Sequence, residues 1–129
     1  MGRAKILIVD DDTDMRRALH VRLRAHGYET AFASDGLTAT NVALKEAPDL
    51  MLLDLGLPAG DGFVVMDRFR QNSELSSIPV IVLTAREAQE NAEAAFSAGC
   101  FAFFQKPADN NALMNTIERA LGESDVLMT

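Results

Sequence analysis

Short apolar runs alternate with amphipathic stretches five times along the chain. Most of the apolar runs are rich in branched side chains, which is typical of buried strands. We expect strands at residues 5–9, 28–33, 49–53, 78–83 and 101–105. Between them, apolar residues recur at helical spacing, which predicts amphipathic helices. We expect helices at residues 13–26, 36–47, 62–72, 87–98 and 110–122.

Cap and stop residues bound these helices. Aspartate accepts backbone N–H groups at a helix start, whereas glycine and proline favour its end. Asp61 and Asp109 are the predicted starts of two helices, and the predicted ends are Gly27, Pro48, Gly99 and Gly122. The inward faces are expected to be Met15, Leu19 and Leu23; Ala39, Val42, Ala43 and Ala47; Val65, Met66 and Phe69; Ala88, Ala92, Ala95 and Phe96; and Leu113, Ile117, Ala120 and Leu121.

Strict alternation of strand and helix predicts an α/β fold in which helices cover both faces of a five-stranded parallel sheet, the doubly wound (βα)5 architecture. A chain of 129 residues is one ordinary domain, too short for a second core. We therefore expect a single domain over residues 1–129, with its core at 4–122 and a frayed tail at 123–129.

The charge balance narrows the class of partner. The net charge is -7 and the pI about 4.7, so the domain as a whole would repel a phosphate backbone, and direct nucleic-acid binding is not expected. The longest apolar run is far below the roughly 18 residues of a membrane span, and residues 1–5 lead into a strand rather than an export signal. We expect a cytoplasmic protein without membrane contact.

Cysteine and histidine add no chemistry. Cys100 is the only cysteine, which excludes an intrachain disulfide and predicts a small packed hydrophobe. His20 and His26 are six residues apart in the first helix and point in different directions, so solvated or capping roles are expected.

Four strand ends together carry an acid-rich set of polar side chains. Asp10 and Asp11 follow the first strand, Asp54 closes the third, and Thr84 and Lys106 follow the fourth and fifth. In doubly wound sheets, ligands bind outside the carboxyl ends of the strands. The sequence therefore predicts one acid-rich site at that edge.

Three neighbouring carboxylates would repel one another unless a cation neutralised them, and oxygen ligands favour Mg²⁺ over zinc. A phosphoryl group on Asp54 would then find donors in Lys106 and Thr84. Each residue also has a structural interpretation. Asp12 or Thr13 is expected to cap a helix rather than do chemistry, and Lys106 or Thr84 alone would be a solvated lysine or a turn residue.

From about residue 4 to residue 122, the chain resembles the receiver (response-regulator) domain of two-component signalling. The resemblance lies in Ile6-Leu7-Ile8-Val9-Asp10-Asp11-Asp12, Asp54-Leu55-Gly56-Leu57-Pro58 with Asp61-Gly62, Leu83-Thr84-Ala85 and Gln105-Lys106-Pro107. It implies the flavodoxin-like strand order 2-1-3-4-5 seen in chemotaxis regulators. It also implies a cis Lys106-Pro107 bond.

The resemblance further implies roles for the site residues. Asp54 would accept a phosphoryl group from a phosphohistidine on a sensor histidine kinase or histidine phosphotransfer protein, or from acetyl phosphate. Mg²⁺ would be held by Asp11 and Asp54 directly, by Asp10 through water and by the backbone carbonyl of Gly56. Lys106 would pair with the phosphoryl group. Thr84 and then Phe103 would move, reshaping the face formed by the fourth helix, fifth strand and fifth helix for an output partner or a phosphorylation-dependent homodimer.

Some positions depart from the family pattern. The switch aromatic is Phe103 where tyrosine is common, and it is as consistent with a packed strand residue as with a rotating switch. Phe101, Ala102 and Phe104 form an aromatic-rich edge that fits either a partner surface or core packing. Gly56 and Arg86 occupy positions that tune phosphorylation and hydrolysis rates in the family.

The leading hypothesis is a phosphorylation-controlled switch that is no conventional enzyme but catalyses its own aspartyl phosphorylation and dephosphorylation. One alternative is the receiver part of a larger regulator with a DNA-binding or enzymatic output domain. A second, a Mg²⁺-dependent phosphatase, is disfavoured because its nucleophile would follow the first strand. A third, a receiver that no longer takes up phosphate, is disfavoured because no site residue is missing.

Overall fold

The computed structural model describes residues 3–57, 62–85 and 88–126, which form five parallel strands and five helices. The strands are β1 (Lys5–Val9), β2 (Glu29–Ala33), β3 (Leu50–Leu53), β4 (Val80–Thr84) and β5 (Ala102–Gln105). They pair side by side in the order β2-β1-β3-β4-β5. The predicted doubly wound fold is confirmed, and β2 and β5 are the edges of the sheet.

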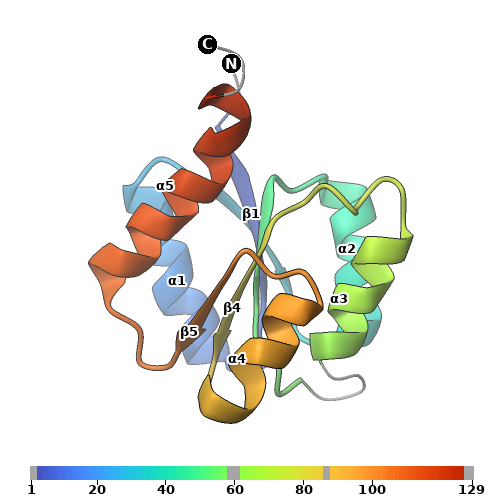
Figure 1. Cartoon of the computed structure of the whole chain (residues 1–129). Helices are drawn as coiled ribbons and strands as arrows, with labels where there is room; N and C mark the ends of the chain where they lie inside the picture. The colour runs from blue at the N-terminus through green and yellow to red at the C-terminus, as the bar shows by residue number, and fades with distance from the viewer. Residues whose placement is uncertain (1–2, 58–61, 86–87, 127–129) are drawn as a thin grey trace.

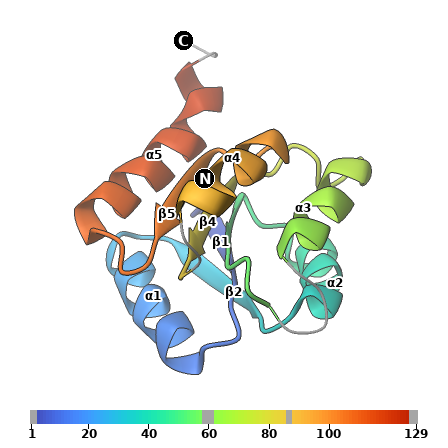
Figure 2. The same cartoon turned by 60° about the horizontal axis from the view of Figure 1, so that its bottom comes forward.

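Helices cover both faces of the sheet. They are α1 (Thr13–Ala25), α2 (Gly36–Glu46), α3 (Gly62–Gln71), α4 (Ala88–Ser97) and α5 (Asn110–Val126). Figures 1 and 2 show α1 and α5 on one face and α2, α3 and α4 on the other. No helix in the described part of the chain is long and apolar enough to cross a bilayer.

Aspartate side chains cap three helices as expected from their preference for backbone N–H donors. Asp12 accepts hydrogen bonds from the amides of Asp14 and Met15, which confirms its capping role at α1. Asp35 accepts from Thr38 N, and Asp109 accepts from Ala112 N. The predicted cap Asp61 lies outside the described residues.

Three of the four predicted helix stops agree with the structure, because α2 also ends directly before Pro48, and one departs from it. Gly27 and Gly99 have φ of 88° and 102°, the left-handed conformation that ends a helix at little cost in glycine. Ala47 ends α2 at a φ of 50° and is exposed, so its predicted inward position is wrong. Gly122 does not end α5, which continues to Val126, so the predicted helix end at this glycine is wrong.

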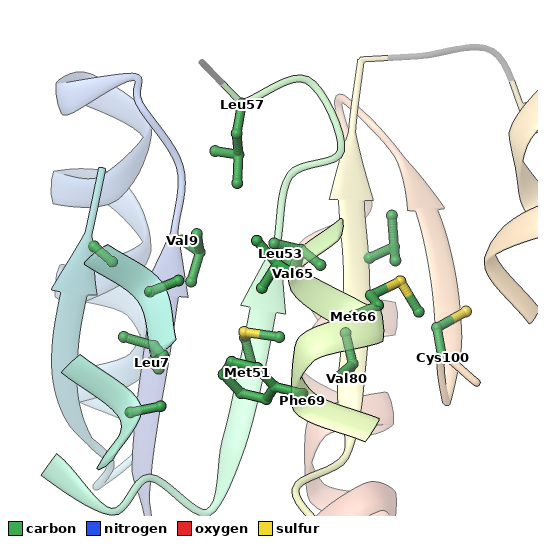
Figure 3. Packing of buried hydrophobic residues seen from close by; sticks show 14 of the residues in the cluster. Leu7, Val9, Met51, Leu53, Leu57, Val65, Met66, Phe69, Val80 and Cys100 are labelled. Carbon is green, nitrogen blue, oxygen red and sulfur yellow. The ribbon is translucent and has the colours of Figure 1, made fainter. Parts of the chain in front are cut away.

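The sheet separates two apolar clusters. On the α2, α3 and α4 side, Val65, Met66 and Phe69 of α3 pack against β3 and β4 side chains such as Met51 and Val80 (Figure 3). On the α1 and α5 side, the cluster contains Leu19, Leu23, Leu113 and Ile117 together with the alternate strand residues. β1, β3, β4 and β5 thus supply apolar residues to both faces, as covered parallel strands do, whereas the edge strand β2 supplies Ala31 and Ala33 to the α2, α3 and α4 side only.

Besides Ala47, a second predicted core residue lies on the surface. Phe96 of α4 is 51% exposed, although Ala95 beside it is fully buried and Ala92 half-buried. In an alanine-rich helix the small residues already satisfy the inward stripe, so the aromatic ring is not required there. The side chain of Ala88 lies outside the described set.

Strand register brings the carboxyl ends of the strands to a common edge. Val9 pairs with Leu53, Leu53 with Val82, and Thr84 with Gln105. The residues that follow β1, β3 and β5 therefore leave the sheet at the same level.

Candidate functional site

Backbone hydrogen bonds fix the ends of the strands that carry the polar residues. Asp54 N donates to Val9 O at 3.0 Å, which extends the β3–β1 pairing past the last apolar residue. Lys106 N donates to Thr84 O at 2.8 Å and does the same for β5 and β4. The polar side chains are thus presented from rigid strand ends rather than from loose loops.

Three carboxylates converge at this edge. Asp10, Asp11 and Asp54 each offer an oxygen, and these oxygens all lie within 4.8 Å of one another. Asp10 is buried, Asp54 is half-buried and Asp11 is exposed, so the cluster runs from the protein interior to solvent. Oxygen donors in this arrangement can hold a hard divalent cation such as Mg²⁺.

Lys106 lies between two members of the cluster. Its Nζ donates to Asp10 Oδ2 at 2.8 Å and lies 3.7 Å from Asp54 Oδ2. The second oxygen of Asp10, Oδ1, accepts from Asp12 N at 2.9 Å. Both oxygens of the buried Asp10 carboxylate are thereby hydrogen-bonded, as burial of a charged group requires.

Burial and neighbouring charges act in opposite directions on this pair. Burial raises the pKa of Asp10 above its ordinary value, the hydrogen bonds from Lys106 and Asp12 N partly offset the rise, and the nearby Asp54 carboxylate adds to it. Burial lowers the pKa of Lys106, but the hydrogen bond to Asp10 and the acidic field around it outweigh burial, so the Lys106 pKa lies above its ordinary value. Lys106 is therefore charged at neutral pH.

Asp54 is held from its own loop and from α3. Gly56 N donates to Asp54 Oδ1 at 3.1 Å, and Gly62 N donates to Leu55 O at 3.0 Å. A Cβ on Gly62 would lie 2.7 Å from both Asp54 O and Leu55 Cα. Only glycine lets α3 start this close to the backbone of Asp54.

Two contributors were not assigned a role from the sequence. One is Gly62, whose need for glycine arises from an approach that chain order does not reveal. The other is Arg16, whose Nη1 donates to Asp10 O at 2.8 Å. Its position six residues after Asp10, one turn into α1, is the only sequence signal that could have pointed to it.

Thr84 and Phe103 lie on neighbouring strands behind the acidic cluster. Thr84 is the last residue of β4 and is buried. Phe103 pairs with Val82 and is half-buried against the cluster on the α2, α3 and α4 side. Phe101, Ala102 and Phe104 instead pack against the opposite cluster, which favours core packing for that aromatic-rich edge.

Of the remaining candidate residues, Cys100, His20 and His26 lie in the described part of the chain. Cys100 is buried, and burial raises its thiol pKa to about 11. His20 Nδ1 lies 2.7 Å from Thr30 Oγ1, and His26 follows the last residue of α1. Arg86 belongs to the residues that the structure does not describe. The Lys106-Pro107 peptide bond is cis, as the resemblance implied.

Comparison with known proteins assigns this constellation to a family. The sequence model of the response regulator receiver domain matches residues 6–118. The chain belongs to the response regulator receiver family. Solved receiver structures agree: a CheY-like receiver domain protein from Methanospirillum hungatei JF-1 superimposes with a TM-score of 0.88 at 27% identity, covering 96% of this chain and 98% of the other. The chemotaxis protein CheY4 of Vibrio cholerae gives a TM-score of 0.86 at 29% identity, covering 93% and 100%.

Relatives of this receiver domain differ in length. Sporulation initiation phosphotransferase F of Bacillus subtilis is 34% identical over 94% of this chain and 96% of its own. The DNA-binding dual master transcriptional regulator RpaA of Synechocystis is 33% identical over 94% of this chain. The receiver domain spans 50% of the length of RpaA and 24% of that of the response regulator PleD of Caulobacter vibrioides.

Proposed function

We propose that this receiver domain accepts a phosphoryl group on Asp54 and thereby switches the binding of a partner. The donor would be a phosphohistidine on a sensor histidine kinase or histidine phosphotransfer protein, and the domain would then act in the cytoplasm. The observation that carries the proposal is the position of Lys106, which is hydrogen-bonded to Asp10 at 2.8 Å and lies 3.7 Å from Asp54. From this position its ammonium can pair with a phosphoryl group on Asp54 without leaving the site.

The reaction is a transfer between two nucleophiles. An Asp54 carboxylate oxygen bonds to phosphorus while the phosphorus–nitrogen bond of the donor breaks, and the leaving imidazole nitrogen keeps the electron pair and takes a proton. Gly56 N holds Oδ1, so Oδ2, on the Lys106 side, is the attacking oxygen that we infer. Phosphoryl transfer requires mainly positioning and charge neutralisation, and Lys106 provides both.

We assign the Mg²⁺ site to the same acids. Asp11 and Asp54 would bind the ion directly, Asp10 through water and Gly56 through its backbone carbonyl. The engagement of both Asp10 oxygens, by Lys106 and by Asp12 N, supports an indirect role for Asp10. When bound, the ion neutralises the carboxylates and the incoming phosphoryl oxygens.

The switch that we propose runs from Thr84 to β5. The Thr84 hydroxyl would donate a hydrogen bond to the phosphoryl group. The Phe103 ring would then move into the space that Thr84 leaves. Thr84 O holds Lys106 N, and Leu83 and Phe104 are paired, so motion at the end of β4 acts on β5. The surface of α4, β5 and α5 would then bind an output partner or a second phosphorylated copy.

Labelling with acetyl phosphate tests the phosphoacceptor. Wild type should gain the mass of one phosphoryl group with Mg²⁺ and none with EDTA. Asp54→Asn should gain none. Asp14→Asn, which removes an exposed acid in the first turn of α1, is the matched control and should label like wild type. Labelling of Asp54→Asn, or labelling that survives chelation, would overturn the proposal.

A second arrangement is the receiver part of a larger regulator, which the match to half of RpaA favours. Phosphorylation of Asp54 would then act on a DNA-binding or enzymatic domain of the same chain. The complete reading frame decides between the two arrangements.

A further inference from the structure

Helix α1 is basic in an otherwise acidic domain. It carries Arg16, Arg17, Arg22 and Arg24 against the single acid Asp14, while the whole chain has a net charge of -7. The arginines lie on two flanks. Arg22 lines a groove toward Pro107 and α5, whereas Arg16 and Arg17 line a separate notch toward β2.

The notch beside β2 combines positive charge with an exposed ring. It is a shallow hollow of about 280 Å³ lined by Thr13, Arg16, Arg17, His20 and Phe32. Phe32 is 42% exposed, and its ring centroid lies 5.6 Å from that of His20. His20 in turn contacts Thr30 Oγ1 at 2.7 Å, so α1 and β2 are fastened together along the notch.

β2 is an edge strand, and no other strand among the described residues pairs with its outer side. Glu29 N donates to Ala4 O and Ala33 O accepts from Asp10 N, so residues 29 and 33 direct their amides and carbonyls toward β1. In a parallel pair this direction alternates along the strand, so Thr30 and Phe32 direct theirs away from the sheet. The strand Glu-Thr-Ala-Phe-Ala contains neither lysine nor proline, the residues that commonly discourage pairing at an edge.

We propose that the β2 edge and the adjoining flank of α1 bind an extended acidic segment of a partner protein, which adds a strand beside β2. Its main chain would pair with Thr30 and Phe32, and its alternate side chains would face α1. Carboxylates would meet the exposed Arg17 and Arg24, which is two turns further along α1. An apolar side chain would cover the Phe32 ring.

The positive charge of α1 favours an acidic partner segment over a second copy of this chain at the β2 edge. Symmetric pairing of two β2 edges would bring the same arginine-rich flank against itself, since a two-fold interface joins identical patches. An acidic partner would be attracted by these arginines, whereas a second copy would be repelled by them. The site needs neither Asp54 nor a metal ion, so it goes beyond the proposed function and can be tested apart from it.

An NMR titration of the full ¹⁵N-labelled chain tests the site. The probe is an N-acetylated heptapeptide in which glutamate alternates with valine and phenylalanine. We expect saturable shifts of the Thr30 and Phe32 amides, and no binding by the lysine counterpart or by the same peptide with N-methylated backbone amides. Arg17→Glu should weaken binding about fivefold. Arg22→Glu, the same charge change on the other flank of α1, should leave the Kd within about twofold.

Several results would overturn the proposal. They are the absence of shifts at millimolar peptide, shifts confined to β5, and equal losses in Arg17→Glu and Arg22→Glu. Concentration-dependent self-association through β2 would assign the edge to a second copy instead. Asp54→Asn should bind the peptide like wild type, so a failure of the phosphorylation proposal leaves this result unaffected.

Discussion

Nζ of Lys106 and Oδ2 of Asp10 form a 2.8 Å ion pair that joins the residue after β5 to the residue after β1, 96 positions apart. The side chain of Asp10 is only 4% exposed and that of Lys106 15%. The pair therefore contributes to stability as well as to the proposed chemistry.

Loss of this pair should destabilise the fold. Lys106→Met keeps an aliphatic stem but leaves a buried carboxylate without its cation, and we expect the free energy of unfolding to fall by about 2 kcal/mol. Urea unfolding without Mg²⁺ measures it. The control is Lys5→Met, because the Lys5–Glu46 pair is more exposed and should be worth less than about 1 kcal/mol. Equal losses in the two variants would contradict the assignment.

Removal of one acid should have the opposite effect. Asp54→Asn keeps an oxygen for Gly56 N and relieves repulsion with Asp10. It loses the longer, 3.7 Å attraction between Asp54 and Lys106 but leaves the 2.8 Å Asp10–Lys106 bond in place. Without Mg²⁺ we expect its free energy of unfolding to rise by about 1 kcal/mol. Adding Mg²⁺ should raise the melting temperature of wild type more than that of the variant, because binding stabilises only a folded site. A less stable variant in EDTA would count against repulsion in the cluster.

Burial of Cys100 gives stability a pH dependence with a defined sign. The thiol pKa is about 11 in the folded chain against an ordinary 9.0, so between these values the unfolded chain loses the proton first. Stability from this group is complete below pH 9.0 and is lost as pH rises through about 11. Relative to Cys100→Ala, wild type should lose on the order of 1–3 kcal/mol over this range, measured by urea unfolding. Parallel curves for the two proteins would show that the thiol is not buried as described.

Glycine substitution tests the approach of α3 to the site. The added Cβ of Gly62→Ala would meet Asp54 O and Leu55 Cα at 2.7 Å, so the start of α3 must move. We expect a loss of about 2 kcal/mol or more in urea unfolding and slower labelling of Asp54. Unchanged stability and labelling would contradict this packing.

Gly122→Ala is the contrasting variant. A Cβ there meets nothing within 4 Å, and the residue lies inside α5. The substitution should therefore raise the free energy of unfolding by roughly 0.5–1 kcal/mol. Destabilisation would instead indicate that the helix ends at this glycine.

Sequence patterns predicted the order and type of all ten elements, because most strands are apolar and each helix has an inward stripe. They were less informative where several outcomes satisfy the same local rule. In the sequence, Gly27, Gly99 and Gly122 are equally good helix stops. Helix α5 nevertheless continues past Gly122, because its end extends beyond the sheet (Figure 1). The exposure of Phe96 was likewise hidden by the alanines around it.

The sequence predicted where the candidate site lies, but not which hydrogen bonds and ion pairs its residues form. Parallel strands place their carboxyl ends together, which is enough to group Asp10, Asp54 and Lys106. Which carboxylate Lys106 binds depends on side-chain burial, because only the interior acid requires its own cation. The contacts of Arg16 and Gly62 depend on how α1 and α3 lie against the strands, which no local pattern encodes.

The aromatic residues of β5 are divided between the two layers of helices. Phe103 packs with the α2, α3 and α4 layer, whereas Phe104 packs with the α1 and α5 layer. A displacement of Phe103 alone would disturb the packing of the first layer and leave that of the second unchanged. Under the proposed function, the packing around Phe103 would therefore respond to phosphorylation of Asp54, while the packing of α1 against the other face of the sheet would keep its arrangement.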